Sequence, residues 1–523
     1  MRKMGEIIVS VLIVGFCFLL QDICSQRYQV LAAGPEYGGT LSVAVESDAQ
    51  GFDPIKTGSM NTSTRSVAMA IEERLFDMDE KGNLVPELGL SAKPSKNGMS
   101  WTIRLRKGVS FHDGTPFNAD AVVQHWQRIL DPKSRFKGLI YIQPIESVKK
   151  EDEFTVRFLL KHPWSSFKDT ITGAHAIASY IPSPKAVREG TQDRAPVGTG
   201  PYMFKEWITN DRFVAIRNPK YWRKGKPYLD NIVFRTVPDM QTRFAGLQSG
   251  ELDVIITDRG ASVLQAQGEP SLKVYSSEST GAEIFALNTS KPPLDDVRVR
   301  QALSYAWNQD FYVKASYKDT IPVVKDPFGG AISCGEVSYH EYNPEKGRKL
   351  LAEYGKPVSL ELLHTNTSRG REFGEIVQRL FKEIGVTVRL TPLTFGQWIK
   401  RVMTNDYQMS GWQLFDATDM GPYLFGSLFS KSEVNVTHYK NPKMDEMLMI
   451  QETSTDPRTR QKALCGVAKL INEDAPFLYR GGLRFNIIAK SKVQGISKVD
   501  HGIIRVRDAW VKRRENKTQK AKL

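Results

Sequence analysis

The sequence predicts an α/β protein, because segments with strand-like and helix-like hydrophobic spacing alternate along its 523 residues. That length corresponds to about three compact units at roughly 150 residues per domain. Hydrophobic residues make up 41% of the chain and charged residues 25%, a balance that supports large buried cores and excludes wholesale disorder. No stretch reaches the roughly 18–20 consecutive apolar residues of a membrane-spanning helix, so a polytopic membrane protein is also excluded.

The first 33 residues are predicted to be a secretory signal peptide. Arg2 and Lys3 precede a fourteen-residue apolar run at 7–20, and small residues at 30–33 suit a cleavage site. As a helix this run would rise about 21 Å, too little for a hydrocarbon core of about 30 Å. An uncleaved N-terminal anchor is the alternative. The sequence therefore predicts a periplasmic or other extracytoplasmic protein.

The charge of the chain does not identify a partner. Lys and Arg total 72 against 58 Asp and Glu, a formal net charge of +14. The excess is spread along the chain, and its one dense run is the tail at 512–522, which is typical of a solvated segment. Nucleic-acid binding would need basic residues interleaved with stacking aromatics on one face, so no nucleic-acid partner is expected.

Two of the four cysteines, Cys334 and Cys465, lie beyond the predicted signal. Two thiols cannot form a structural zinc site by themselves, and an exported chain of this size does not need a disulfide framework. A disulfide between them and two buried free thiols both fit the sequence. Their spacing does not decide between the two.

Alternating hydrophobicity predicts strands at 40–45 and 101–106. In the second of these, Trp101, Ile103 and Leu105 face one side and polar residues face the other. Further short strands are expected at 213–216, 232–234, 254–256 and 284–287. No flexible linker separates these segments, so the domains are expected to be joined by several tight crossings.

The clearest unit runs from 360 to 390. A strand at 360–363 is followed by a polar loop at 364–370, a helix that ends near Gly385, and a second strand at 386–390. One stripe of the helix carries its apolar side chains, which are Phe373, Ile376, Val377, Leu380, Phe381 and Ile384. Ligands of open α/β sheets bind beyond the carboxyl ends of the strands, so the loop 364–370 is a candidate ligand contact. An ordinary solvated connection is the alternative.

Catalytic motifs are mostly absent from the sequence. There is no His-Glu-x-x-His, Cys-x-x-Cys, P-loop or Gly-x-Ser-x-Gly pattern, and the eight histidines show no metal-ligand spacing. Asp113 and Gly114 are interpreted as a turn. We therefore expect no enzymatic activity, no cofactor and no metal site, with a secreted hydrolase that uses scattered acidic residues as the enzyme alternative.

The segment 101–120, which reads Trp-Thr-Ile-Arg-Leu-Arg-Lys-Gly-Val-Ser-Phe-His-Asp-Gly-Thr-Pro-Phe-Asn-Ala-Asp, resembles the signature region of the peptide/nickel family (family 5) of solute-binding proteins. These proteins serve ATP-binding-cassette (ABC) importers. Further segments resemble blocks of the same family and occur in the expected order, at 196–202, 217–222, 250–253, 288–302 and 439–445. The resemblance thus extends over most of the predicted mature chain.

This resemblance implies a two-lobed periplasmic-binding-protein fold of type II that closes on a solute. The first lobe would span 34–283 and return with 477–523, with an extra subdomain at about 82–195, and the second lobe would span 284–476. The partners implied are a small solute such as a peptide and the permease and ATPase subunits of an importer, and the protein would be a monomer. The alternative solutes are a nickel chelate, haem, glutathione, a sugar or an opine.

The resemblance also implies binding residues in the second lobe. In peptide-binding relatives, a Gly-Trp pair that ends a strand is followed, three positions after the Trp, by an acidic residue that pairs with the peptide ammonium. Here the pair is at 411–412 and that position holds Phe415, with Asp416 and Asp419 one and four positions later. Either aspartate is a candidate, and Trp412, Phe415 and Tyr423 are candidate apolar walls. A loop or capping role for the aspartates and a core role for the aromatics are the alternatives.

Three further residues complete the predicted site. In some relatives a basic residue in the loop after the preceding strand takes the peptide carboxylate, which makes His364 and Arg369 candidates. A guanidinium can pair with a carboxylate through two hydrogen bonds, whereas His364 fits the position better. Glu46 follows the first strand of the predicted mature chain and is expected to line the facing lobe.

Overall fold

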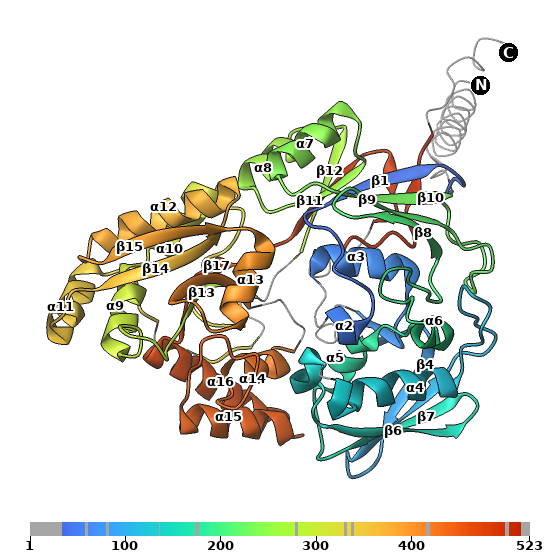
Figure 1. Ribbon diagram of the computed structural model, residues 1–523, viewed down its shortest axis with the longest axis horizontal. Coiled ribbons are helices and arrows are strands. Elements are labelled where there is room, and N and C mark those ends of the chain that lie inside the picture. Colours follow the sequence, from blue (N-terminus) through green and yellow to red (C-terminus); the bar gives the residue numbers. More distant parts are fainter. Residues whose placement is uncertain are drawn as a thin grey trace, which may run out of the picture. The chain divides into compact units, whose positions relative to one another are not determined.

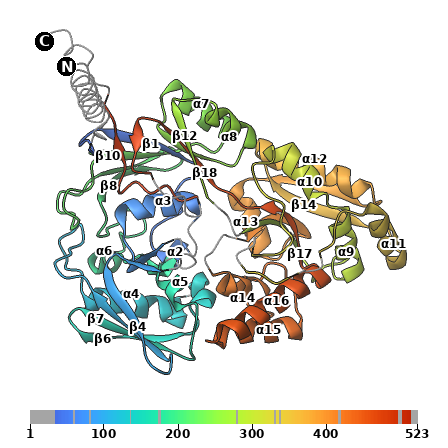
Figure 2. The ribbon, with the colours of Figure 1, turned by 180° about the vertical axis from the view of Figure 1, so that it is seen from behind.

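The computed structural model in Figures 1 and 2 describes residues 34–57, 61–79, 83–134, 136–172, 177–277, 281–328, 332–335, 339–414, 419–496 and 502–513. Their helices and strands lie within Tyr37–Val511, which packs as one unit. The predicted signal peptide at 1–33 lies outside the described residues. Across the described residues, no helix combines the length and the apolar composition needed to span a bilayer.

The first sheet has the strand order β12–β18–β11–β1–β10–β9–β8. Its strands are β1 (Thr40–Val45), β8 (Tyr202–Ile208), β9 (Arg212–Arg217), β10 (Asn231–Thr236), β11 (Val254–Thr257), β12 (Leu272–Ser276) and β18 (Asn486–Lys490). β1 has the predicted bounds and pairs in parallel with both β10 and β11. These three strands therefore end at one edge of the sheet, where α7 (Met240–Ser249) follows β10 and α8 (Gly260–Gln267) follows β11.

The second sheet has the strand order β15–β14–β16–β13–β17. Its strands are β13 (Ala282–Leu287), β14 (Ser359–Thr365), β15 (Thr387–Leu393), β16 (Met409–Leu414) and β17 (Phe477–Gly482). β14 pairs in parallel with β15 and β16, whereas β13 runs antiparallel to β16 and β17. The carboxyl ends of β14, β15, β16 and β17 therefore meet at the same edge as the start of β13.

The predicted βαβ unit is confirmed as β14, α12 (Ser368–Lys382) and β15, and Figure 1 shows α12 lying along this part of the second sheet. Five of the six apolar residues on the predicted stripe are buried, and Ile376 is partly buried. Gly385 takes a φ of +82° just after the helix. The polar loop is shorter than expected, because β14 continues to Thr365 and α12 begins at Ser368, where the Thr367 hydroxyl accepts the Gly370 N–H at 3.1 Å.

A third sheet has the order β4–β5–β7–β6, with β4 (Gly89–Pro94), β5 (Ser100–Leu105), β6 (Ile145–Asp152) and β7 (Thr155–Leu160). α4 (Ala119–Leu130) lies against β6 and β7, as Figures 1 and 2 show. Trp101, Ile103 and Leu105 are buried, which confirms them as core residues of this sheet. The predicted turn is also confirmed, with Gly114 at a φ of +85°.

Two short hairpin-like pairs and the remaining helices complete the described elements. The pairs are β2 (Phe76–Met78) with β3 (Leu84–Pro86) and β19 (Val493–Gln494) with β20 (Trp510–Val511). The α-helices not yet named are α2 (Pro54–Thr57), α3 (Thr62–Ile71), α5 (Phe167–Thr172), α6 (Pro184–Arg188), α9 (Val297–Ala306), α10 (Gln309–Tyr317), α11 (Pro344–Tyr354), α13 (Phe395–Met403), α14 (Gly421–Leu428), α15 (Pro442–Thr453) and α16 (Pro457–Asp474). Short 3-10 helices occur at Pro132–Ser134, Lys137–Tyr141 and Ile177–Ser179.

Sheet membership bears on where the lobes divide. β13 and β17 pair with each other inside the second sheet. The expected boundaries at 283/284 and 476/477 would cut β13 and assign β17 to the first lobe. The expected lobe boundaries stay a prediction, since β13 at Ala282 opens the second sheet and β17 at Gly482 closes it. The pairing of two strands almost two hundred positions apart leaves no local pattern in the sequence.

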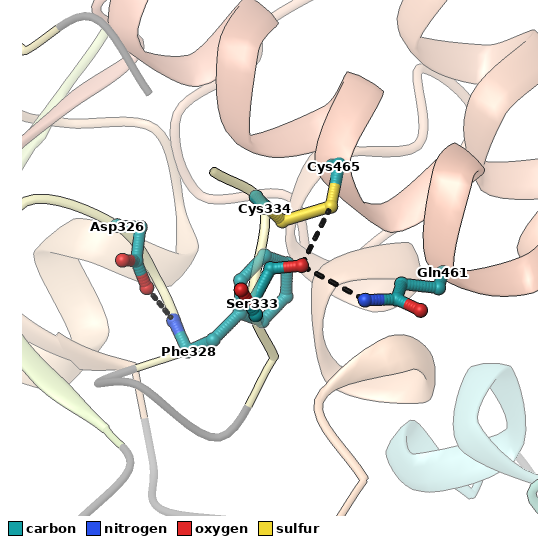
Figure 3. Close-up of a disulfide and its surroundings, with 6 residues drawn as sticks. All are labelled: Asp326, Phe328, Ser333, Cys334, Gln461 and Cys465. Atoms are coloured by element: carbon teal, nitrogen blue, oxygen red, sulfur yellow. Dashed lines mark hydrogen bonds between the residues drawn. A yellow bond between two sulfur atoms is a disulfide. The ribbon is translucent and has the colours of Figure 1, made fainter. Parts of the chain in front are cut away.

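Cys334 and Cys465 form a disulfide, with their Cα atoms 5.3 Å apart. As Figure 3 shows, it joins the segment 332–335 to α16, and the Gln461 side-chain amide of the same helix donates to the Ser333 carbonyl at 2.8 Å. The structure thus resolves the pairing that the spacing of these cysteines leaves open.

Candidate functional site

A cavity of about 710 Å³ lies where strands of the first and second sheets end. From the first sheet, the carboxyl ends of β1, β10 and β11 contribute Glu46, Thr236 and Asp258. From the second sheet, the carboxyl ends of β14 and β16 contribute His364 and Trp412. This is the place where open α/β sheets bind their ligands, because loops and side chains beyond the strand ends are free to vary.

Strand register brings Glu46 and Asp258 to neighbouring positions. Val43 of β1 is paired with Val254 of β11, and Ala44 with Ile255, so Glu46 and Asp258 follow adjacent parallel strands at the same edge. Both side chains line the cavity. The first sheet thus presents two carboxylates to a solute from one edge.

Arg369, near the start of α12, is held by groups from both sheets. One guanidinium nitrogen pairs with Asp258, and another pairs with Glu283 and donates to the Tyr317 hydroxyl. Burial alone would lower the pKa of Arg369, but these two carboxylates raise it well above its usual value. Arg369 therefore stays charged and joins the end of β11 to the start of β13 across the cavity.

Among the carboxylates that line the cavity, Glu283 has the most positively charged and hydrogen-bonding partners. Besides Arg369, it pairs with Arg480 at 3.2 Å and accepts the Tyr317 hydroxyl at 2.7 Å. Arg480 also donates to the Tyr312 hydroxyl at 2.5 Å. Burial would raise the pKa of Glu283, but the two guanidinium groups outweigh burial and lower it. This group of residues is an internally neutralised network.

Glu46 is the opposite case. Its side chain is exposed within the cavity although protein surrounds the site, and burial raises its pKa above the ordinary value of 4.5. The positive charges of Arg243 and Arg369 act against this rise, and the negative charge of Asp258 adds to it. Within the described residues, the Glu46 carboxylate makes no hydrogen bond or ion pair with another side chain.

His364 and Trp412 form parts of the cavity wall in the second sheet. The His364 Nδ1–H donates to the Thr365 carbonyl at 2.9 Å, and burial lowers the pKa of His364, which favours a neutral imidazole. The Trp412 ring packs 5.4 Å from that of Trp398, whose indole N–H donates to the Ser410 hydroxyl at 2.7 Å. These aromatic rings supply a rigid apolar surface next to the charged groups.

Two predicted site residues lie elsewhere. The Asp419 carboxylate accepts the Ser166 hydroxyl at 2.7 Å and pairs with Arg460 of α16 at 2.6 Å. The Tyr423 ring stacks on Tyr141 with centroids 6.0 Å apart. Neither residue is among those that line the cavity, although the Tyr423 hydroxyl donates to the carbonyl of the lining residue Gln413 at 3.4 Å.

Phe415 and Asp416 lie outside the described residues, so their predicted contacts with a solute stay predictions. Of the eight predicted residues, four line the cavity: Glu46, His364, Arg369 and Trp412. Among the residues that the structure describes, no group of three or more His, Cys, Asp or Glu side chains is placed to hold a metal ion.

Sequence reasoning missed Asp258, Glu283 and Arg480. Asp258 directly follows a strand that the alternation predicts, so the rule about strand ends could have found it. Glu283 and Arg480 lie within β13 and β17, where Glu283 is paired with Gly481 and Arg480 is the extra residue at a shift of the register. Only the folded structure shows that the two side chains form an ion pair. No short-range pattern signals that contact.

Comparison with known proteins identifies the family. The family model described as "Bacterial extracellular solute-binding proteins, family 5 Middle" matches residues 83–435. The chain belongs to this family. The glutathione-binding protein of Pectobacterium atrosepticum is 30% identical over 487 residues, which cover 89% of this chain and 93% of that protein. A probable di/tripeptide-binding protein of Pseudomonas aeruginosa is 28% identical, with 89% and 94% of the two chains covered.

A solved structure of a similar protein agrees with this family assignment. The ABC transporter-associated periplasmic binding protein of Helicobacter pylori, in complex with the peptide STSA, superposes with a TM-score of 0.84 at 24% identity and covers 91% of this chain and 99% of its own. The predicted two-lobed periplasmic-binding-protein fold is therefore confirmed. Its function is confirmed with it: the chain is the extracytoplasmic solute-binding component of an ABC importer and serves the importer's permease and ATPase subunits.

Proposed function

We propose that this family 5 protein captures a peptide or a similar small solute in the cavity at the strand ends and delivers it unaltered to the permease. It would be a monomer exported by the segment 1–33, with one lobe built on the first and third sheets and the other on the second sheet. Closure of the lobes would be driven by contacts that the solute makes with both, because a ligand shifts an equilibrium only by its differential affinity for the two states.

The cavity itself is the observation that supports this proposal most directly. Its volume of about 710 Å³ falls within the roughly 300–1,000 Å³ that is usual for small-molecule sites. It is lined by strand ends from both sheets, with carboxylates, guanidinium groups and indole rings in reach of one solute. A peptide offers matching groups along its length: charged termini, backbone amides and side chains of any polarity.

Among the predicted residues, Glu46, His364 and Trp412 would contact the solute directly. Arg369 would act as a bridge between the lobes, because its guanidinium is already paired with Asp258 and Glu283. A solute carboxylate would have to displace one of these pairs. Asp416, which follows β16, keeps its predicted role in this proposal.

Thermal unfolding in the presence of a ligand panel tests the solute class. The panel holds a tripeptide pool, glutathione, a nickel–histidine chelate, haem and a mixture of simple sugars. A ligand at about 100 times its Kd raises the free energy of unfolding by about 2.7 kcal/mol. We expect the peptide pool to give the largest rise. Stabilisation by a non-peptide ligand alone, or by no member of the panel, would contradict the proposal.

A further inference from the structure

A second contact joins the two proposed lobes away from the cavity. On the side of the first and third sheets it is formed by Tyr141, at the end of a short 3-10 helix, and by Ser166, just before α5. On the side of the second sheet it is formed by Tyr423 of α14, by Asp419 shortly before that helix, and by Arg460 of α16. None of these five residues lines the cavity. We call this set the interlobe contact.

The polar part of the interlobe contact joins one serine to an ion pair. An Arg460 nitrogen lies 2.6 and 2.7 Å from the two carboxylate oxygens of Asp419, and the Ser166 hydroxyl donates to one of these oxygens at 2.7 Å. The Arg460 guanidinium also donates to the Ser166 hydroxyl oxygen at 3.2 Å. Ser166 is fully buried, so water does not compete for these bonds while the lobes stay together.

The charges on the two sides are compatible near neutral pH. Burial would raise the pKa of Asp419, but Arg460 outweighs burial and lowers it, so this carboxylate stays charged. Asp169 of α5 faces the same pair from the other side. Burial, with a further contribution from Asp419, raises the pKa of Asp169 to about 8. The Asp169 carboxyl is therefore mostly protonated near neutral pH and does not repel Asp419 across the interlobe contact.

The apolar part of the interlobe contact stacks two tyrosines. The rings of Tyr141 and Tyr423 lie with their centroids 6.0 Å apart and their planes at 13°. Gly426 of α14 leaves room for this approach, because a Cβ there would lie 2.5 Å from the Tyr141 ring. The neighbouring Ile140 packs against the buried apolar cluster of α14 and α16. The two sides therefore fit each other in shape as well as in charge.

Separation of the lobes would break the interlobe contact. The chain passes between the first and second sheets twice, from β12 to β13 and from β17 to β18. The interlobe contact involves neither connection, so nothing in the covalent chain keeps its two sides together. It stabilises the closed arrangement by contacts that the protein makes with itself, in addition to those that a solute makes.

We propose that the interlobe contact favours the closed state before a solute binds, and thereby raises the affinity for every solute that the cavity accepts. This inference rests on the two lobes of the proposed function. The apparent affinity of a protein is reduced in proportion to the fraction of molecules in the binding-competent state. Loss of the interlobe contact would therefore weaken binding although none of its residues lines the cavity.

Small-angle X-ray scattering of the solute-free protein tests this proposal near neutral pH. Ser166→Ala removes the hydroxyl that joins the two sides, and it leaves the ion pair behind it intact. Tyr141→Ala removes the stacked ring from the same side. We expect both variants to have a larger radius of gyration than the wild-type protein, with unchanged far-UV circular dichroism. Ser165→Ala is the matched control, because the Ser165 hydroxyl makes no hydrogen bond within the described residues, and it should keep the wild-type radius.

Equilibrium dialysis against the tripeptide pool measures the consequence for binding. Ser166→Ala should retain the pool about tenfold more weakly than the wild-type protein, which is the loss expected for one hydrogen bond to a charged group. Ser165→Ala should retain it as the wild-type protein does. Both substitutions lie on the side of the contact away from the segment that follows β16, so they leave the predicted role of Asp416 untouched.

Each outcome decides a separate point. A wild-type radius of gyration in both Ser166→Ala and Tyr141→Ala overturns the proposal, and so does an equal expansion in Ser165→Ala. Expansion accompanied by a loss of circular dichroism is unfolding and also contradicts it. Expansion with unchanged retention of the pool overturns the link to affinity. If the wild-type protein retains no tripeptide, the proposed peptide class fails, whereas the scattering comparison needs no solute and still decides whether the contact favours the closed state.

Discussion

Glu46 and Glu283 face the same cavity from two different sheets, and their environments shift their pKa values in opposite directions. Glu283 begins the second sheet's β13 and is neutralised by Arg369 and Arg480. Glu46 directly follows β1 of the first sheet and has no bound cation among the described residues. A buried charge that the protein itself pairs supports the fold, whereas an unpaired charge on the cavity wall is available for a ligand.

The largest expected change in the free energy of unfolding is at Glu283, the carboxylate that two arginines neutralise. Glu283→Gln leaves Arg369 and Arg480 without the carboxylate they share, so we expect the free energy of unfolding to fall by about 3–5 kcal/mol. Urea unfolding followed by circular dichroism measures the change. A loss below about 1 kcal/mol would show that the ion pairs of Glu283 with Arg369 and Arg480 contribute little to stability.

An intermediate effect is expected at Asp258, which holds Arg369 from the first sheet. Asp258→Asn removes one charge from a pair whose side chains are 22% and 29% exposed, so water offsets part of the loss. We expect a fall of about 1–3 kcal/mol in the free energy of unfolding. If Asp258→Asn lowered the free energy of unfolding as much as Glu283→Gln in the same urea titration, the ion pair between Asp258 and Arg369 would contribute as much stability as Glu283 does.

Glu46→Gln should change stability little and in the opposite direction. Because folding raises the pKa of Glu46, its charged form opposes folding. Water screens this exposed side chain, so we expect the variant to be only slightly more stable near neutral pH. This gain should be absent below pH 4.5 and appear as the pH rises through the folded pKa. A series of urea titrations across that range checks the sign; a destabilised variant would imply a partner for Glu46.

Asp239→Asn is expected to have the smallest effect. Asparagine caps helices about as well as aspartate, so the hydrogen bond to the Thr242 N–H can persist, and the free energy of unfolding should change by less than about 0.5 kcal/mol. The same urea titration provides the value. A larger loss would show that the negative charge at the start of α7, and not only its capping geometry, stabilises the cavity wall.

Local patterns predicted several elements of the fold well. The alternation at 40–45 matches β1, and the apolar stripe at 373–384 predicts α12 between two strands. The same strand-end argument led to His364 and would have led to Asp258. Long-range pairing was not predictable, since nothing near Glu283 or Arg480 in the sequence shows that β13 and β17 are neighbours.

Asp419 illustrates the limit of a motif. Its spacing from the Gly-Trp pair suggests a ligand contact, but its carboxylate is engaged by Ser166 and Arg460, which lie 253 and 41 positions away in the chain. Only the folded structure shows that these partners meet. Glu46, in contrast, has no strong sequence motif, and it stands out because of the partners it lacks within the described residues.

Native mass spectrometry of the wild-type protein after incubation with the tripeptide pool tests the central claim most directly. The account predicts one tripeptide bound per chain, and release by denaturation should return peptides whose masses are unchanged. A protein that stays unliganded under these conditions would contradict capture in the cavity. Shortened peptides among the released products would contradict delivery of the solute without chemistry.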